Sequence, residues 1–135
     1  MKQILASIAL VSLATAAGPA QASKTPQLEG RWTSPKRNLI IEVDQCGSAY
    51  CGTVVWASAY AKEQARKSGT PNLIGKQLIS GVRPDGKGGY KGRAFVPKQN
   101  IHATATIRHA GTNAMIVKGC ALRVICKSQR WTRIG

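Results

Sequence analysis

Four cysteines are the residues whose spacing points most directly to chemistry in this sequence. Four residues separate Cys46 from Cys51, and five separate Cys120 from Cys126. Cys46 and Cys51 flank a predicted hairpin loop, so their Cα atoms can approach the separation of roughly 5.5–6 Å that a disulfide favours. Among the possible connectivities we favour the two local pairs, Cys46 with Cys51 and Cys120 with Cys126.

A zinc site is the alternative use of these thiols. Paired zinc ligands are usually separated by roughly two to four residues, and structural zinc sites usually belong to reducing compartments. The spacings here are C-x4-C and C-x5-C, and the C-x-x-C motif of redox enzymes is absent. We therefore expect two disulfides, no metal site and no cofactor.

Few groups are available for acid–base catalysis. His102 and His109 have no carboxylate near them in the sequence, so we expect surface residues and not a catalytic or metal-binding pair. Glu42 and Asp44 share one face of a predicted strand about 6.5–7 Å apart, a separation that glycoside hydrolysis can use. In so basic a chain we expect them instead to pair with Lys and Arg of neighbouring strands. No catalytic residue and no enzymatic activity is predicted, because the common hydrolase, P-loop and zinc-protease motifs are absent.

Aromatic and basic residues near the two ends of the sequence could meet in the fold. If the first and last strands pair, Arg133 can stack on the indole of Trp32, which contributes about 0.5–2 kcal/mol. We prefer this structural, barrel-closing role to a ligand site. Trp56 and Tyr90 are the candidate ligand-binding residues on a cavity wall, with core packing as the alternative for both.

Positioning these residues requires strands that return to one another, and the chain is patterned as short extended segments between turns. Residues 38–45 and 101–108 alternate polar and apolar side chains, and residues 51–58 are rich in β-branched and aromatic types. Residues 59–67 (AYAKEQARK) predict a short helix, with a long basic loop or lid as the alternative. About eight strands are expected, at residues 30–33, 38–45, 51–58, 77–80, 90–96, 101–108, 114–120 and 123–133. This spacing predicts an all-β fold, an antiparallel barrel or sandwich.

The interior of such a barrel decides whether it can hold a ligand. About eight strands enclose a space that side chains just fill or that holds one small ligand. Ile101, Ala103, Ala105 and Ile107 share the predicted inner face, and the two alanines leave more room than larger residues would. One interpretation is a cavity; the other is that bulkier residues of opposite strands fill the space.

The first residues are patterned as an export signal. A basic residue precedes an apolar or small run over residues 4–17, which is shorter than the roughly 20 residues of a membrane-spanning helix. Ala20 and Ala22 are the small residues that signal peptidase recognises. We predict a cleaved signal peptide at 1–22, a single domain at 23–135, no membrane span, and export to the periplasm, where cysteines oxidise.

The chain as a whole carries a strong excess of positive charge. Twenty Lys and Arg against five Asp and Glu give a formal net charge of +15. These residues are spread along the sequence, which either keeps a solvated surface soluble or attracts anionic lipid head groups and lipopolysaccharide. Nucleic acid is not expected as a partner, because a periplasmic protein seldom meets it.

Several short motifs recur in a known family. They are Gly30-x-Trp32, the hairpin from Cys46-Gly47 to Cys51-Gly52, residues 72–75 (NLIG), residues 85–92 (DGKGGYKG), Gly119-Cys120, and residues 125–133, which end in Trp131-Thr132-Arg133. By these motifs the chain resembles the exported bacterial family known as domain of unknown function 2147. The resemblance implies a calycin-like fold, a lipocalin-type up-and-down β-barrel, and it supplies no catalytic residue. Residues 96–102 depart from the family pattern by lacking its glycine and tyrosine.

Two hypotheses of different classes follow. The first is an exported, non-catalytic binding module with a small apolar or amphiphilic ligand in the barrel mouth. The alternative is a basic interaction protein that docks on anionic components of the cell envelope. That alternative requires Lys and Arg to gather on one face, and binding that weakens with salt.

Overall fold

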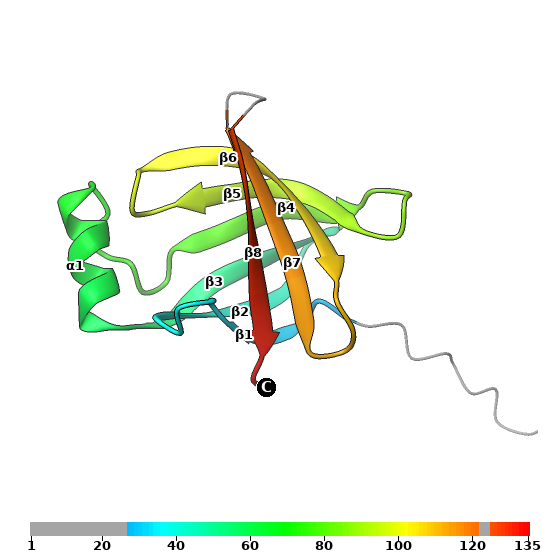
Figure 1. Ribbon diagram of the computed structural model, residues 1–135, viewed down its shortest axis with the longest axis horizontal. Helices are drawn as coiled ribbons and strands as arrows, with labels where there is room; N and C mark the ends of the chain where they lie inside the picture. The colour runs from blue at the N-terminus through cyan, green and yellow to red at the C-terminus, as the bar shows by residue number, and fades with distance from the viewer. Residues whose placement is uncertain (1–26, 122–124) are drawn as a thin grey trace, which may run out of the picture.

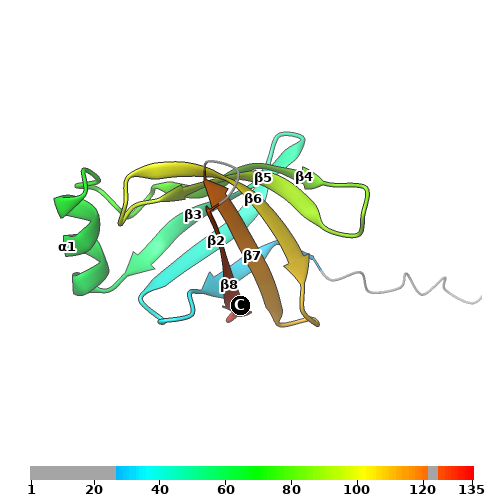
Figure 2. The same ribbon diagram turned by 45° about the horizontal axis from the view of Figure 1, so that its top comes forward.

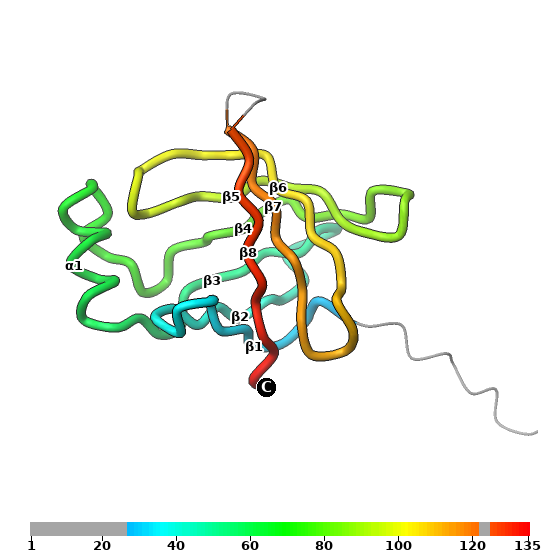
Figure 3. The backbone as a smooth tube through the Cα atoms, in the orientation of Figure 1, coloured from blue at the N-terminus to red at the C-terminus, as the bar shows by residue number. Residues whose placement is uncertain are grey.

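Antiparallel strands joined in sequence order form the whole architecture. The computed structural model describes residues 27–121 and 125–135. In these residues the elements are β1 (Gly30–Thr33), β2 (Leu39–Cys46), β3 (Ala49–Ala57), α1 (Ala59–Lys67), β4 (Gln77–Pro84), β5 (Tyr90–Val96), β6 (Ile101–His109), β7 (Ala114–Ala121) and β8 (Ile125–Arg133). Each strand pairs with the next, and β8 pairs with β1 to close the barrel (Figures 1 and 3). The predicted eight-stranded up-and-down barrel with a short helix at 59–67 is confirmed.

The β2–β3 hairpin is tighter than the sequence indicated. Residues 47–50 were expected to form its loop, but Cys46 pairs directly with Ala49, so only Gly47 and Ser48 remain in the turn. Gly47 has a φ of 69°, the backbone conformation that a type II′ turn needs at its first central position. Tyr50 therefore belongs to β3 and turns its side chain toward the barrel interior.

Helix α1 begins at a serine cap and buries one narrow stripe. The Ser58 hydroxyl accepts a hydrogen bond from the Ala61 amide (3.1 Å), which satisfies an amide of the first turn. Ala61 and Ala65, four residues apart, are the buried residues of the helix and join the hydrophobic core. Just beyond the helix, Ser68 donates to the Lys98 carbonyl (2.6 Å), so the helix lies beside the β5–β6 turn.

The two ends of the barrel differ in their connections. We call the end that carries the β2–β3, β4–β5 and β6–β7 turns the closed end. The opposite end, where α1 and the β5–β6 turn lie, is the open end (Figures 1 and 2). Large side chains fill the barrel near the closed end, where Trp32, Ile107 and Met115 are fully buried.

Candidate functional site

The seam between the first and last strands is built around one arginine. Trp32 pairs with Arg133 in the sheet register, and the guanidinium carbon lies 4.3 Å from the indole centroid. The guanidinium also donates hydrogen bonds to the carbonyls of Gln27 and Glu29. The indole nitrogen of Trp32 donates to the Leu28 carbonyl (2.8 Å). The structure thus ties the segment before β1 across the closed end through the two residues that the sequence placed there.

Gly30 leaves the room that this seam needs. A Cβ atom at Gly30 would lie 2.5 Å from the Arg133 guanidinium and 2.6 Å from the Gly135 carbonyl oxygen. The backbone there also has a φ of 130°, which L side chains rarely adopt. The Gly30-x-Trp32 spacing therefore has a physical cause: the glycine admits the arginine that covers the tryptophan.

An aromatic cluster fills the closed end behind the seam. Tyr90 meets Tyr50 and His109 edge-on, with 6.0 Å between ring centroids in each pair. Burial is the main cause that raises the pKa of Tyr90, and the nearby Tyr50 raises it further. Tyr90 was a candidate for a cavity wall; the structure places it in this packed cluster. The other candidate, Trp56, is 46 % exposed on β3 and joins neither the cluster nor the core.

His109 is not the surface residue that we expected. Both ring nitrogens are buried and have no hydrogen-bond partner among the described residues. Burial lowers the pKa of His109, and the charge of Arg133 lowers it further. The alternation of β6 carried the signal, because His109 has the same parity as the inward residues Ala105 and Ile107. His102, with the opposite parity, is exposed as expected.

The inner wall changes character toward the open end. Ala105 is fully buried, whereas Ala103, two residues along the same face, is only half-buried. Ala103 pairs with Ala94 on β5. On β7, a Cβ atom at Gly119 would meet only the Cβ of Ala103, at 3.9 Å. Bulky residues therefore fill the closed end, as one interpretation expected, whereas the small inner-face residues Ala94, Ala103 and Gly119 are only partly buried toward the open end.

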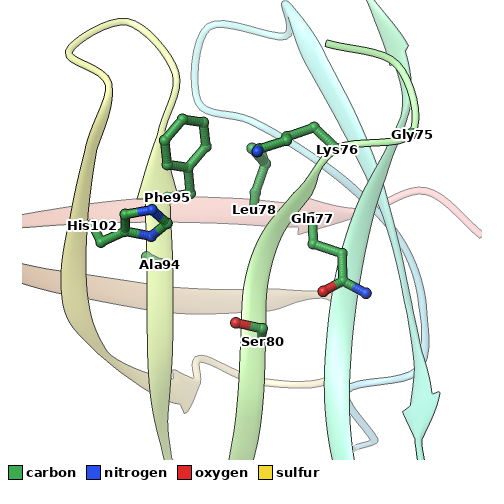
Figure 4. Close-up of a pocket in the computed structure, with 8 residues that line it drawn as sticks. All are labelled: Gly75, Lys76, Gln77, Leu78, Ser80, Ala94, Phe95 and His102. Atoms are coloured by element: carbon green, nitrogen blue, oxygen red, sulfur yellow. The ribbon is translucent and has the colours of Figure 1, made fainter. Parts of the chain in front are cut away.

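A pocket with a volume of about 360 Å³ lies against the same wall from outside. Phe95 on β5 pairs with His102 on β6, one step along from the inward pair of Ala94 and Ala103. Successive side chains of a strand point to opposite faces, so Phe95 and His102 belong to the outer face. The sticks in Figure 4 show these two rings side by side, with Lys76 reaching toward them. The pocket is lined by Gly75, Lys76, Gln77, Leu78, Ser80, Ala94, Phe95 and His102.

Basic residues gather on this outer face. Arg83 pairs with Lys91 across β4 and β5, and Lys91 and Lys118 both pair with Thr106. We call the set the basic outer wall; it consists of Arg83, Lys91, Arg93, Arg108, Lys118 and Arg130. Among the described residues only Arg108 of this set has an acidic partner, Asp85, at 3.4 Å. The Asp85 pKa is lowered chiefly by the backbone amide of Lys87.

The cysteines form two local disulfides. Cys46 is bonded to Cys51 beside the tight hairpin turn, with Cα atoms 5.8 Å apart. Cys120 is bonded to Cys126 across β7 and β8, with Cα atoms 4.1 Å apart. No group of three metal-ligating side chains occurs within residues 27–121 and 125–135. Disulfides suit an oxidising compartment; the predicted signal peptide, residues 1–22, lies outside the described residues.

The acidic pair that we considered for glycoside hydrolysis does not act as a pair. Glu42 forms an ion pair with Arg31 of the neighbouring strand at 3.4 Å. Both side chains are well exposed, so the ion pair contributes little to stability. In the described part of the chain no helix is long and apolar enough to cross a membrane.

Comparisons with known proteins agree with this architecture. The model of a family described as "Uncharacterized protein conserved in bacteria (DUF2147)" matches residues 30–133. Among solved structures, the chain is similar to protein HP1028 from the human pathogen Helicobacter pylori, which is described as belonging to the lipocalin family. The two share 14 % identity with a TM-score of 0.63, over 82 % of this chain and 85 % of that one. At this identity the likeness concerns the fold. None of the curated proteins matches the chain.

Proposed function

This chain belongs to the bacterial family DUF2147, and from that premise we propose that it is a non-catalytic binding module. Its ligand is a small apolar or amphiphilic molecule held at the open end of the barrel. The observation that carries the proposal is the partly exposed stretch of small inner-face residues, Ala103 and Gly119, where an added Cβ atom at Gly119 would meet only the Cβ of Ala103. Lipocalin-like barrels commonly take ligands at such a mouth.

The chemistry of the open end fits an amphiphile. Ile101 and Ile125, both on the inward face, are 37 % and 60 % exposed, so apolar surface is available near the rim. Lys127 also has inward parity and is exposed; it supplies a charge for a polar head. A ligand that covers the two isoleucines gains about 25 cal/mol for each Å² of apolar surface removed from water.

The arrangement of titratable groups supports a binding role over catalysis. His102 lies on the outer face of β6, while His109 lies on the inner face and meets the Tyr90 ring edge-on. Glu42 is engaged by Arg31. Among the described residues these groups do not converge on a shared point, as an acid, base and nucleophile must.

Compartment and domain limits belong to the same proposal. The two disulfides suit an oxidising environment, and we place the working protein in the periplasm. In this proposal residues 1–22 are removed on export and residues 23–135 form the binding domain.

Native mass spectrometry of protein purified from the periplasm, without a delipidating step, tests the binding module. We expect a stoichiometric extra mass. Ala103→Phe, on the inner face, should remove that mass because the ring occupies the mouth. Thr104→Phe, the next residue on the outer face, is the matched control and should retain it. A bare polypeptide, or an extra mass that survives in Ala103→Phe, would contradict the proposal.

The basic outer wall favours a second candidate function, docking on anionic components of the cell envelope. Five of its six cations have no ion-pair partner among the described residues. Neighbouring unpaired cations on one sheet face repel one another and attract anionic lipid head groups. The set lies on the outward side of five adjacent strands, β4 to β8, and this docking function requires that one anionic surface reach several of these cations.

Flotation with vesicles that contain phosphatidylglycerol tests this docking. We expect binding that weakens as salt rises, because exposed charges are screened beyond about 10 Å at 0.1 M salt. The double variant Lys91→Gln, Lys118→Gln should bind at least about tenfold more weakly, since each Lys near an anionic surface contributes about 1 kcal/mol. Lys36→Gln with Lys62→Gln removes the same charge elsewhere and serves as the control. Equal loss in both double variants would leave only a nonspecific charge effect.

A further inference from the structure

The outer pocket combines an apolar floor with groups that donate hydrogen bonds or carry positive charge. Phe95 and Leu78 are 8 % and 6 % exposed, although Phe95 stands on the outer face of the barrel wall. Lys76 holds its ammonium 4.7 Å from the Phe95 ring centroid. The His102 ring lies on the same phenyl ring at 4.9 Å, tilted by 44° (Figure 4). An apolar ring and the Lys76 ammonium are therefore adjacent in this pocket.

The charge balance of the pocket is one-sided. Lys76 takes part in none of the ion pairs formed by the described residues. The polar lining consists of Lys76, Gln77, Ser80 and His102, with no carboxylate among the lining residues. Arg93 of the basic outer wall pairs with Ser80 and so adds a second cation beside the pocket. A negatively charged group that enters here therefore meets the Lys76 ammonium and no opposing carboxylate among the lining residues.

The size of the pocket narrows the class of ligand. A volume of about 360 Å³ lies at the lower end of the range for small-molecule sites, roughly 300–1,000 Å³. The pocket is open, and its apolar lining of Phe95 and Leu78 suits a flat ring that packs against their exposed edges beside Lys76 and His102. Lys76 is then positioned to pair with an anionic substituent at the edge of that ring.

We propose that the Phe95–His102–Lys76 pocket on the outer face of β4–β6 is a second ligand site, for a small aromatic anion. Its Phe95 and His102 side chains lie on the outer face of the wall whose inner face carries Ala103, so it is separate from the site proposed at the open end, although Ala94 borders both. Inward Ala103 and outward His102 are successive residues of β6, so variants on that strand can block either site alone.

Nuclear magnetic resonance titration with 2-naphthoate tests this site, with 2-naphthamide as the uncharged counterpart. We expect saturable shifts centred on the amides of residues 76–80, Phe95 and His102, and weaker binding of 2-naphthamide. Lys76→Gln should weaken 2-naphthoate binding about tenfold, as expected for a lost hydrogen bond to a charged group. Lys62→Gln removes an exposed lysine from α1 and should leave the affinity unchanged. Ser80→Phe should abolish binding by filling the pocket from β4.

Two results would overturn this inference. The first is 2-naphthoate binding with equal affinity to Lys76→Gln and Lys62→Gln, or without saturation. The second is a set of shifts centred on Ala103 and Gly119 that disappears in Ala103→Phe. That second result assigns the probe to the open end and leaves the proposed function standing. Retained 2-naphthoate binding in Ala103→Phe, with loss in Ser80→Phe, supports the outer site independently of the open-end ligand.

Discussion

The two ends of this barrel differ in how their inner side chains are packed, although the same strands run through both. At the closed end Trp32, Met115 and Ile107 are fully buried, and Arg133 fastens the segment before β1 over them. At the open end the same sheet presents the small residues Ala103 and Gly119, which are only partly buried, and among the described residues a Cβ atom at Gly119 would meet only the Cβ of Ala103.

This difference indicates how stability and binding are divided. Packed interiors lose several kcal/mol when a large side chain is removed, so the fully buried residues of the closed end contribute strongly to stability. Partly exposed apolar surface at the open end contributes less to folding, and in the proposed function a ligand covers it. A barrel of this size therefore need not be hollow throughout to carry a binding site.

The largest expected contrast comes from two tryptophans. Trp32→Ala removes a side chain that is 0 % exposed, and should lower the free energy of unfolding by about 3–5 kcal/mol. Trp56→Ala removes one that is 46 % exposed, and should cost less than about 1 kcal/mol. Urea denaturation followed by circular dichroism measures both. Similar losses in the two variants would remove the distinction between the ends.

Two alanines on one strand provide a closer comparison. Ala105 is 0 % exposed and pairs with Gly92 and Gly119, so Ala105→Phe should cost about 3 kcal/mol through overpacking. Ala103→Phe, two residues nearer the open end, should cost less than about 0.5 kcal/mol. Urea denaturation followed by circular dichroism measures the free energy of unfolding of both variants. A costly Ala103→Phe would mean that the open end is filled as tightly as the closed end.

Each end also has its own disulfide. The bonds close short loops, with sequence separations of 5 and 6, and loops of this length contribute about 2 kcal/mol each. Replacing Cys46 and Cys51 by serine should cost more than replacing Cys120 and Cys126, because Cys51 is buried at 6 % exposure. The melting temperatures of the two double variants measure these losses. A larger loss on replacing Cys120 and Cys126 would contradict the prediction.

The smallest expected effect is a pH dependence of the closed end. The pKa of His109 is lowered from 6.5 by burial and then by Arg133, so the unfolded chain binds a proton more readily than the folded chain. The free energy of unfolding should therefore fall as pH drops below 6.5 toward the lowered value, with no further loss from this group below it. Asp85, whose ordinary pKa is 3.8 and is lowered here, titrates below that window.

His109→Gln should reduce this pH dependence, whereas His102→Gln on the outer face should leave it intact. Denaturation midpoints measured between about pH 5 and pH 7.5 test the pair, since this range brackets the ordinary His pKa. An unchanged slope in His109→Gln would show that His109 is not enclosed as the structure describes.

Local patterns predicted the elements well because each depends on near neighbours. The helix at Ala59–Lys67 was predicted with its observed bounds, since a serine cap and helix formers act within a few residues. Strand alternation over 101–108 also assigned Ala105 and Ile107 to the inside. The β2–β3 loop was predicted too long because Tyr50 pairs with Gln45 of the adjacent strand, and pairing between strands is not a local property.

The candidate sites were harder to predict, because they depend on which strands become neighbours. Trp56 and Tyr90 were chosen for their residue type, yet they lie at different ends of β3 and β5 and share no site. Phe95 was overlooked, although it interrupts a face that otherwise carries Lys91 and Arg93. An aromatic residue with the parity of basic residues is a usable signal, but its meaning required Lys76 and His102 beside it.

The sequence by itself determined the approximate positions of the strands, the position of the helix, the basic character and the local pairing of cysteines close in the chain. These properties follow from side-chain periodicity, composition and short loop closure. The tertiary structure alone decided which end of the barrel is filled, that His109 is enclosed, and that Lys76, Phe95 and His102 share a pocket. Burial and cross-strand contact arise from residues far apart in sequence, and only closure of the sheet brings them within contact distance.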